Sequence, residues 1–554
     1  MKEIKNKKLL KTIYKIAILI LGLILLNFVS SKIYFQLDLT KDKRYTLAKV
    51  TKDIVSKIES PLVVKVYLEG DFPTEFKRLQ LETKQHLKQL RNTNKNIVIR
   101  FVNPLGMEKD LIAQGMQPSR LSVQEGAKVS QAIIFPYAQI IYNKKVENIS
   151  LLSQTNFKSQ EEQLTASIEN LEYAFTDAIH KVTKTKRKNI AILTGNNELD
   201  FIYLDGLLKT LSQHYHLEPF PLDSANVIPQ KTLELLTKFD MALIAKPIKR
   251  FTENEKFTLD QFQTNGGKTL WLIDNVVAEQ DSLAQTGNTL AINRDLNLTD
   301  LFFQYGVRPK FNIVKDLYSA TIKLANGNVG GQTQFKDYLW NYYPMITSKN
   351  NHPINKNILP VQLKFANTID LLKNNIKKTV LLQSSKLSKS FGTPFEINLD
   401  EVSEKPKPEN FNKGNQTLGV LLEGEFNSAY KDRLKPFKSD LYKEKSTANK
   451  MILIADGDIV KNQIHQGEPV DLGIDKWTSQ RYGNKEFLLN AVNYLLDDNG
   501  LLQLRSKKIQ LQFLDKEKAF KERTFWQVIN IVLPLVILGL FGFLFSYFRK
   551  RKYA

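Results

Sequence analysis

Two uninterrupted apolar runs stand near the ends of the chain, and both have the composition of membrane helices. Ile16 to Ser31 and Thr524 to Phe548 contain no charged side chain. As helices they would extend about 24 Å and about 37 Å, against a hydrocarbon core of roughly 30 Å. Pro534 lies inside the second run, where membrane helices tolerate it. The pattern therefore predicts two transmembrane helices.

Positive charge lies on the terminal side of both runs. Six lysines and one glutamate precede the first run, and Arg549 to Lys552 are all basic. Because cationic flanks stay in the cytoplasm, we expect a two-pass protein of the bacterial inner membrane, with both tips cytoplasmic and residues from about 36 to 520 periplasmic. The alternative for the first run is a cleaved signal peptide ending at Val29-Ser30-Ser31, but the run is longer than a usual signal core, which favours retention.

The first part of the body alternates between helical and strand-like periodicity. After a helix at 45–60, the predicted elements are a strand at 62–68, a helix at 74–91, a strand at 97–102, a helix at 109–114, and strands at 129–142 and 146–151. This β-α-β-α-β-β order is similar to that of thioredoxin-like domains, and Pro136 lies near the place where such folds have a cis-proline. Without cysteine the unit has no redox chemistry, so we interpret it as an interaction module.

The middle of the chain predicts a parallel sheet covered on both faces. A long helix at 160–182 has one apolar stripe, and we interpret it as a packed connector. Short apolar strands then alternate with helices: strands at 189–193, 240–245 and 268–273, and helices at 201–214 and 252–264. Nearly continuous apolar strands that alternate with helices are typical of parallel sheets.

The pattern in the rest of the body is less regular. The predicted elements are a helix from about 296 that ends at Gly306, strands near 311–324, 361–365, 378–383, 418–422 and 450–455, and a helix at 484–496. Residues 397–417 are polar and contain two prolines, which predicts a linker.

The fold class that we predict is α/β, flanked by a transmembrane helix at each end. At roughly 150 residues per domain, a chain of this length should hold three to four domains. The divisions are 1–35 for the basic tail and first membrane helix, 36–155 for the thioredoxin-like domain, 156–187 for the connector, 188–395 for an α/β domain with a β-rich extension, 396–417 for the linker, 418–515 for the continuation of the α/β domain, and 516–554 for the second membrane helix and tail.

Composition excludes several kinds of chemistry. The chain has no cysteine, so disulfides, zinc–thiolate sites and a cysteine nucleophile are excluded. The formal net charge is +22, but the basic residues of the body are scattered and no nucleic-acid motif appears. The string Gly266 to Thr269 (GGKT) suggests a phosphate loop, yet Phe262 stands where its first glycine should be, and a helix precedes it where a strand should.

No catalytic, metal-ligating or cofactor-binding residue follows from the motifs. The chain lacks a G-x-S-x-G elbow, an HExxH motif and a Rossmann glycine fingerprint. Among the six histidines, only His214 and His216 have a suggestive spacing, and no third ligand can be named. We therefore assign them surface or packing roles.

Polar residues that directly follow predicted strands mark a possible ligand crevice. They are Thr194, Gly195, Asn196, Glu198, Asp274, Asp456 and Asp458. In open α/β sheets, ligands bind beyond the carboxyl ends of the strands. Asp and Asn are also ordinary helix caps and turn residues, and this second interpretation is the one we favour.

Several long strings along the chain have a distinctive sequence. They include DLTKDKRYTLAKVTKDI (38–54), VKVYLEGDFPTEFKRLQ (64–80), SIENLEYAFTDAI (167–179), ALIAKPIKRFTENEKFTLDQFQTNGGKTLWLID (242–274), LNLTDLFFQYGVR (296–308), GNVGGQTQF (327–335), KTVLLQSS (378–385), ADGDIVKNQ (455–463) and LGIDKWTSQRYGNKEFLLNAVNYLLDD (472–498). Together they cover most of the chain, and they resemble the gliding-motility ABC-transporter auxiliary subunit family GldG of Bacteroidetes, often labelled substrate-binding.

The resemblance implies an auxiliary component of an ABC complex that supports gliding, with a separate permease subunit and a separate ATPase subunit as partners. It also implies an α/β domain shared with intraflagellar-transport-like proteins and related in fold to class I glutamine amidotransferases. No cysteine stands at the amidotransferase nucleophile position, and the turn after the strand at 189–193 has TGNNE where relatives often carry TGHGE. No catalytic residue is carried over.

Three hypotheses follow, and the first is preferred. The chain is a non-catalytic scaffold or coupling subunit, anchored in the membrane at both ends. The alternative is a substrate-binding subunit with a ligand near Thr194, Glu198, Asp274 and Asp456. A hydrolase or transferase is the third, and it lacks a recognisable nucleophile and base.

Overall fold

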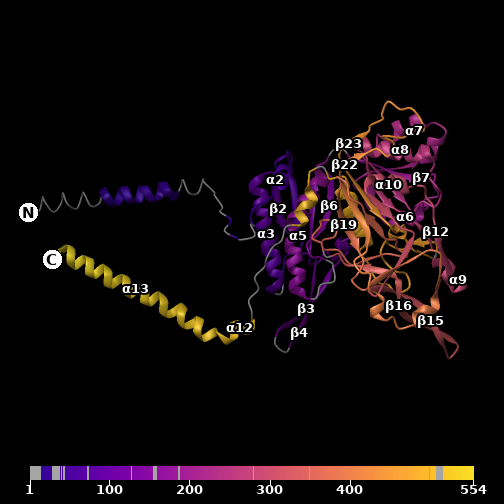
Figure 1. Ribbon diagram of the computed structural model, residues 1–554. Coiled ribbons are helices and arrows are strands. Elements are labelled where there is room, and N and C mark those ends of the chain that lie inside the picture. Colours follow the sequence, from indigo (N-terminus) through magenta and orange to yellow (C-terminus); the bar gives the residue numbers. More distant parts are fainter. Residues whose placement is uncertain are drawn as a thin grey trace, which may run out of the picture. The chain divides into compact units, whose positions relative to one another are not determined.

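The computed structural model describes residues 14–27, 38, 40, 44–70, 74–125, 128–153, 159–184, 187–278, 280–348, 350–497, 499–506 and 516–553 (Figure 1). The chain divides into two compact units, Met1–Lys507 and Lys508–Ala554. The fold is mixed α/β, as the sequence predicts.

Apolar helices are found near both ends, but they differ in length. In the second unit, α12 (Lys516–Lys521) precedes α13 (Arg523–Tyr553), whose 29-residue stretch Arg523–Arg551 is long and apolar enough to cross a membrane. The N-terminal apolar helix covers Tyr14–Asn27, about 21 Å, which is shorter than a hydrocarbon core. Ser31, the end of the predicted first span, lies outside the described residues.

The N-terminal part of the first unit contains a four-stranded sheet in the order β2-β1-β5-β6. Strands β1 and β2 are parallel, and β5 is antiparallel to both β1 and β6. Its elements are α2 (Lys49–Ser56), β1 (Leu62–Val66), α3 (Thr74–Thr93), β2 (Ile97–Phe101), α4 (Glu108–Ala113), β5 (Tyr137–Tyr142) and β6 (Lys145–Ser150).

The prediction of a single strand at 129–142 is wrong. Strand β4 (Lys128–Ile134) ends before Pro136 and pairs with β3 (Ser119–Glu125), which the pattern did not predict, in a separate hairpin. Proline has no N–H to donate to a ladder, so the strand breaks there. The peptide bond before Pro136 is not cis; the described cis bond is Thr393–Pro394.

A seven-stranded sheet in the order β19-β22-β23-β10-β9-β7-β8 forms the centre of the first unit. The strands are β7 (Asn189–Thr194), β8 (His216–Pro221), β9 (Met241–Ala245), β10 (Lys268–Leu272), β19 (Lys377–Gln383), β22 (Thr417–Asn427) and β23 (Lys445–Ile454). The five strands from β8 to β23 are parallel, β22 runs antiparallel to β23, and β19 at the edge runs antiparallel to β22.

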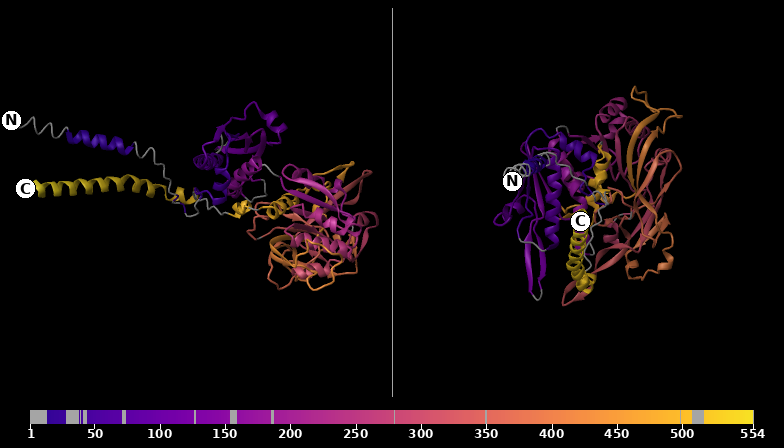
Figure 2. Two further views of the ribbon diagram at one scale, coloured as in Figure 1. Left: turned by 90° about the horizontal axis from the view of Figure 1, so that it is seen from above. Right: turned by 90° about the vertical axis from the view of Figure 1, so that its left-hand side faces the viewer.

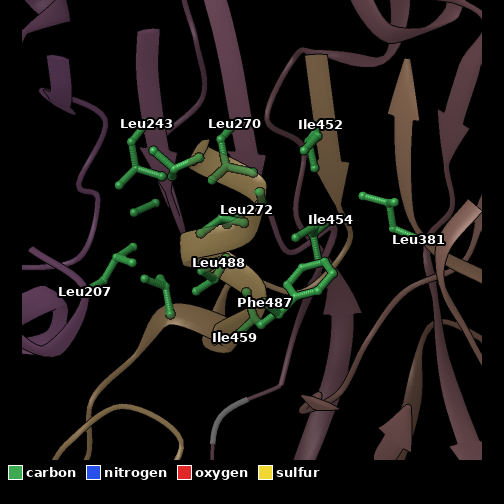
Figure 3. Close-up of a cluster of buried hydrophobic side chains, with 14 of the residues drawn as sticks. Leu207, Leu243, Leu270, Leu272, Leu381, Ile452, Ile454, Ile459, Phe487 and Leu488 are labelled. Atoms are coloured by element: carbon green, nitrogen blue, oxygen red, sulfur yellow. The ribbon is translucent and has the colours of Figure 1, made fainter. Parts of the chain in front are cut away.

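Both faces of this sheet are buried, which explains the near-continuous apolar strands. In β10, Leu270 and Leu272 face one core and Trp271 faces the other. Helices α6 (Phe201–Ser212) and α11 (Asn484–Leu495) cover the first face, where Leu207 and Phe487 pack against the strands (Figure 3). The opposite face is covered by α8 (Glu253–Thr264) and α10 (Thr299–Tyr305). Gly306, in a left-handed conformation with φ 87°, ends α10 as predicted.

The remaining elements are short except for one hairpin. Strands β15 (Ser319–Val329) and β16 (Gln332–Ile346) form a long arm, of which the sequence pattern predicted only the first part. The others are η1 (Leu222–Asn226), α7 (Pro229–Leu236), β11 (Val276–Val277), α9 (Gln280–Thr286), β12 (Asn288–Asn293), β13 (Val307–Pro309), β14 (Asn312–Asp316), β17 (Val361–Gln362), β18 (Ile369–Leu371), β20 (Ser388–Gly392), β21 (Phe395–Asn398), η2 (Leu399–Ser403), η3 (Pro408–Asn410), η4 (Asp458–Val460), β24 (Ile464–His465), β25 (Glu468–Pro469) and η5 (Leu501–Ser506).

Helix α5 (Gln160–Thr183) connects the two sheets and packs against α2, α3 and η5. It is labelled in Figure 1, and Figure 2 gives two further views of the same ribbon. The Ser159 hydroxyl caps it by accepting from the Glu162 N–H at 3.1 Å. The Glu172 carboxylate accepts from the Ala48 N–H at 2.7 Å and from the Thr51 hydroxyl at 2.8 Å. At the next residue, the Arg505 guanidinium of η5 lies 5.3 Å from the centre of the Tyr173 ring. The helix therefore contacts both α2 and η5.

We predict that Gly267→Ala destabilises the protein. Gly267 lies in the turn between α8 and β10, and a Cβ atom there would be 2.3 Å from the Phe262 ring, which is completely buried. Overpacking of this kind costs about 1–3 kcal/mol, so the thermal midpoint of the detergent-extracted chain should fall by several degrees. The control is Gly392→Ala, whose added Cβ would meet nothing within 4 Å. Equal midpoints for the two variants would contradict the packing.

Candidate functional site

Four strand ends meet at the carboxyl edge of the central sheet. Strands β7, β9, β10 and β23 are parallel neighbours in the order β23-β10-β9-β7. Thr194 ends β7, Lys246 follows β9, and Asp274 and Asp456 come two residues after β10 and β23. The structure thus places the sequence-predicted residues along one edge, where α/β sheets bind ligands.

Asp274, Asp456 and Asp458 form a cluster of carboxylates next to the buried Lys246. The Lys246 ammonium lies 2.7 Å from Asp458 Oδ1 and 3.5 Å from Asp274 Oδ2. Lys246 is 2% exposed and Asp456 is 0% exposed. Lys246 has a positive φ of 54°, a conformation that is uncommon for lysine. We call Lys246, Asp274, Asp456 and Asp458 the strand-end cluster.

Backbone N–H groups also donate hydrogen bonds to these carboxylates. The Gly457 N–H donates to Asp274 Oδ1 at 2.6 Å, and the Asp458 N–H donates to Asp456 Oδ1 at 2.7 Å. The Lys364 N–H donates to Asp456 Oδ2 at 2.6 Å. A Cβ atom on Gly457 would meet the Lys246 side chain at 2.6 Å, so the close approach needs a glycine. The carboxylates of the cluster are therefore satisfied by Lys246 and by backbone N–H groups.

The three carboxyl groups differ in proton affinity. Burial, together with the negative charges of Asp274 and Asp458, raises the pKa of Asp456 well above its ordinary value. Burial raises the pKa of Asp274 and outweighs the opposing effect of Lys246. Burial would also raise the pKa of Asp458, but Lys246 and nearby lysines outweigh it and lower that pKa. Asp456 is thus the member that favours the protonated form, and Asp458 is the ionised partner of Lys246.

The turn after β7 has a different environment. The Asn196 N–H donates to Glu198 Oε2 at 2.8 Å, and its side-chain amide donates to Glu255 Oε2 at 3.1 Å. Glu255 belongs to the capping box that begins α8. Gly195 has φ 116°, and a Cβ atom added to it would lie 2.9 Å from Asp223. These contacts connect the turn to the start of α8, and no hydrogen bond among the described residues joins Thr194 to Glu198 with the strand-end cluster.

Sequence reasoning missed the two lysines that organise this edge. Lys246 directly follows a buried strand, so the strand-end argument that selected Asp274 also applied to it. Lys364 follows the short strand β17 and is brought to the edge only by the fold. No local pattern identifies the second lysine.

A cavity of about 780 Å³ lies at the other end of the sheet. It is lined by His180 and His214 and by the ion pairs of Lys181 with Asp177 at 2.9 Å and with Glu147 at 3.5 Å. Burial and the nearby Lys181 lower the pKa of His214 to about 4. His214 is half-buried and His216 is exposed. No group of His, Asp and Glu side chains suited to a metal ion is found in the described part of the chain.

We predict that Lys246→Met strongly destabilises the protein. The substitution keeps most of the side-chain volume but leaves the ionised Asp458 and its neighbour Asp274 without their buried cation. Removing one partner of a buried ion pair costs about 3–5 kcal/mol, which thermal unfolding of the full chain should detect. Lys249→Met, an exposed lysine in the same loop, is the matched control. Unchanged stability in Lys246→Met would contradict the assigned pairing.

Comparison with known proteins identifies the family of the chain. A family model described as ABC-type uncharacterized transport system, an auxiliary component, matches residues 187–491, and a model of a domain of unknown function matches residues 41–141. An uncharacterized protein of Borreliella burgdorferi is 24% identical over 534 residues, which cover 94% of each chain. A solved structure, the mmIFT52 N-terminal domain, matches with 12% identity and a TM-score of 0.30, covering 56% of this chain and 99% of that one. Since the transport-system model spans residues 187–491 of the 554, the protein belongs to the ABC-type transport auxiliary family.

Proposed function

We propose that the protein is a membrane-anchored scaffold and coupling subunit of an ABC transport complex. The members of its family are auxiliary components of such transport systems, and the family is not one of enzymes. The long apolar helix α13, together with this family, indicates association with a membrane. At the membrane, the body of the chain holds the subunits of the complex in a fixed arrangement and carries out no reaction.

The contacts of α5 are the main support for coupling. At one side, Glu172 accepts hydrogen bonds from Ala48 and Thr51, close to the segment that leads to the N-terminal apolar helix. At the other, Tyr173 lies under Arg505, two residues before the end of the first unit. Glu172 and Tyr173 are adjacent, so the two chain segments that lead toward the apolar helices are held by the same turn of one helix.

A salt bridge also connects α5 to the centre of the unit. The Lys356 ammonium lies 2.9 Å from Glu169 Oε2, and the Lys356 carbonyl accepts from the Arg505 guanidinium at 2.5 Å. Both side chains of the salt bridge are mostly buried. A rigid helix with buried polar contacts on both sides suits a part that transmits displacement.

The finer assignments are part of this proposal. The partners are a permease subunit and an ATPase subunit, and the complex is of the gliding-motility GldG type of Bacteroidetes. Both apolar helices cross the inner membrane, both tips are cytoplasmic, and the body is periplasmic, as the basic flanks support. The N-terminal domain is thioredoxin-like, which the order β2-β1-β5-β6 supports. The domain divisions given by the sequence pattern are retained, and the α/β domain is related to the amidotransferase-like fold.

Ligand capture at the carboxyl edge is the second candidate function. A cavity of about 290 Å³ adjoins Asp458 of the strand-end cluster. The other residues predicted for the crevice, from Thr194 to Glu198 and at Asp274 and Asp456, do not line it. A ligand there would contact the cluster through Asp458 alone.

We expect the tagged full chain, extracted in mild detergent from its native cells, to co-purify with a permease and an ATPase. Scaffold subunits are held by many contacts, so recovery should survive washing at moderate salt. The control is the chain truncated after residue 515, which lacks α12 and α13 and should lose the permease. Repeated isolation of an intact permease–ATPase pair without this chain would contradict the proposal.

The absence of cysteine allows a direct test of topology. In intact spheroplasts, a membrane-impermeant maleimide should label Lys405→Cys in the body, but should label Lys5→Cys and Lys552→Cys only after permeabilisation, because both tips are cytoplasmic. Labelling of either tip in intact spheroplasts, or loss of the residue 5 label from the mature chain, would show that the two-pass topology is wrong.

A further inference from the structure

The cavity of about 290 Å³ at the carboxyl edge has an unusual lining. It combines lysines with aromatic rings, and the residues that matter are Tyr203, Lys364, Asp458, Lys461, Lys476 and Trp477. They come from the start of α6, from the loop after β17 and from the two loops that follow η4 and β25. The volume is at the lower end of small-molecule sites, so a compact ligand fits it.

None of the three lysines forms an ion pair with a carboxylate of the described residues. The Lys476 ammonium donates to the Ile464 carbonyl at 2.9 Å, and the Lys364 ammonium donates to Gln280 Oε1 at 3.3 Å. The Lys461 ammonium lies 5.3 Å from the centre of the Tyr203 ring. The closest partners of these three cations among the described residues are therefore neutral groups, while the carboxylate of Asp458 acts on Lys364 and Lys461 from a longer distance.

The carboxylates of the lining do not cancel this positive charge. Asp458 is already paired with Lys246 at 2.7 Å, outside the lining. Asp281 is the other carboxylate of the lining, which contains three lysines. Burial lowers the pKa of Lys364 although the carboxylates of Asp458, Asp475 and Asp456 oppose the shift, so its ammonium retains a desolvation cost that a bound anion would offset. The lining thus holds more lysines than aspartates, which favours a negatively charged ligand.

The loop that carries Lys476 and Trp477 is held in place before any ligand arrives. Asp475 accepts from the Trp477 N–H at 3.0 Å, from the Thr478 N–H at 2.8 Å and from the Gln463 side chain at 2.9 Å. The Gln463 oxygen in turn accepts from the Lys476 N–H at 2.8 Å. A preorganised loop lowers the entropic cost of binding.

Trp477 supplies a surface for a flat group. Its side chain is 57% exposed, although indole rings are usually buried, and it lines the same cavity as the lysines. Tyr203 provides a second ring. Aromatic faces next to cations are suited to ligands that have a ring and a negative group.

We propose that this cavity binds a compact organic anion that has a carboxylate or phosphate group and a flat ring, with Lys461 and Lys476 holding the anion and Trp477 stacking on the ring. This inference deepens the second candidate function and rests on it, but it is independent of the coupling role.

The test is tryptophan fluorescence of the detergent-extracted full chain, titrated with phenyl phosphate, benzoate and uncharged benzyl alcohol. We expect saturable quenching by at least one of the two anions and no response to benzyl alcohol. Trp477→Phe should abolish the change, because Trp271 and Trp340 are buried, Trp526 belongs to α13, and none of these three lines the cavity. Phenyl phosphate alone would assign a phosphate, and benzoate alone a carboxylate.

A double substitution separates the site from adventitious binding. Lys461→Gln with Lys476→Gln should weaken binding about tenfold or more, because charge-assisted hydrogen bonds are lost. Lys405→Gln, an exposed lysine elsewhere, should bind as the wild type does. Equal quenching by benzyl alcohol, unchanged affinity in a folded double variant, or no saturable response to either anion would overturn the proposal. If the double variant fails to fold, the comparison of charged and uncharged probes on the wild type decides. Co-purification with the permease and ATPase is a separate result that none of these outcomes changes.

Discussion

Burial of both faces of the parallel sheet is the constraint on which the rest of the structure depends. Adjacent residues such as Leu270 and Trp271 point to opposite sides, and each is almost completely buried. Helical layers must therefore cover both faces, and the crossovers that supply them leave the strands parallel, with their carboxyl ends at one edge. In this way residues 246, 274 and 456, far apart in the chain, are brought to one edge of the sheet.

The same constraint explains what the sequence could predict. Apolar strands such as β9 and β10 are buried on both faces and produce a strong local pattern, so the α/β class and the strand-end position of Asp274 followed from it. Strand β8 contains two prolines and lies at the sheet edge, and the strand was not predicted. The role of Lys246 depends on partners from two other strands, which no local pattern contains.

The strand-end cluster and the neighbouring cavity divide the carboxyl edge into two different environments. In the cluster, Lys246 and three backbone N–H groups already satisfy the carboxylates, so a ligand would have to displace existing bonds. In the cavity, Lys461 and Lys476 form no ion pair with a carboxylate of the described residues, and their closest partners are the Tyr203 ring and the Ile464 carbonyl. Electrostatics therefore favours the cavity over the cluster as the place for an anion, although sequence reasoning pointed to the cluster.

Coupling and ligand capture are compatible because they use opposite ends of the central sheet. The α5 contacts with Arg505 lie near the amino ends of the parallel strands, beside the cavity that contains His214 and Asn189. The anion cavity lies at the carboxyl ends, beyond Asp458. A sheet buried on both faces is stiff because its packed core resists deformation. In the proposed function, a ligand in the anion cavity would therefore act on α5 across the packed sheet, from the carboxyl ends of the strands to their amino ends.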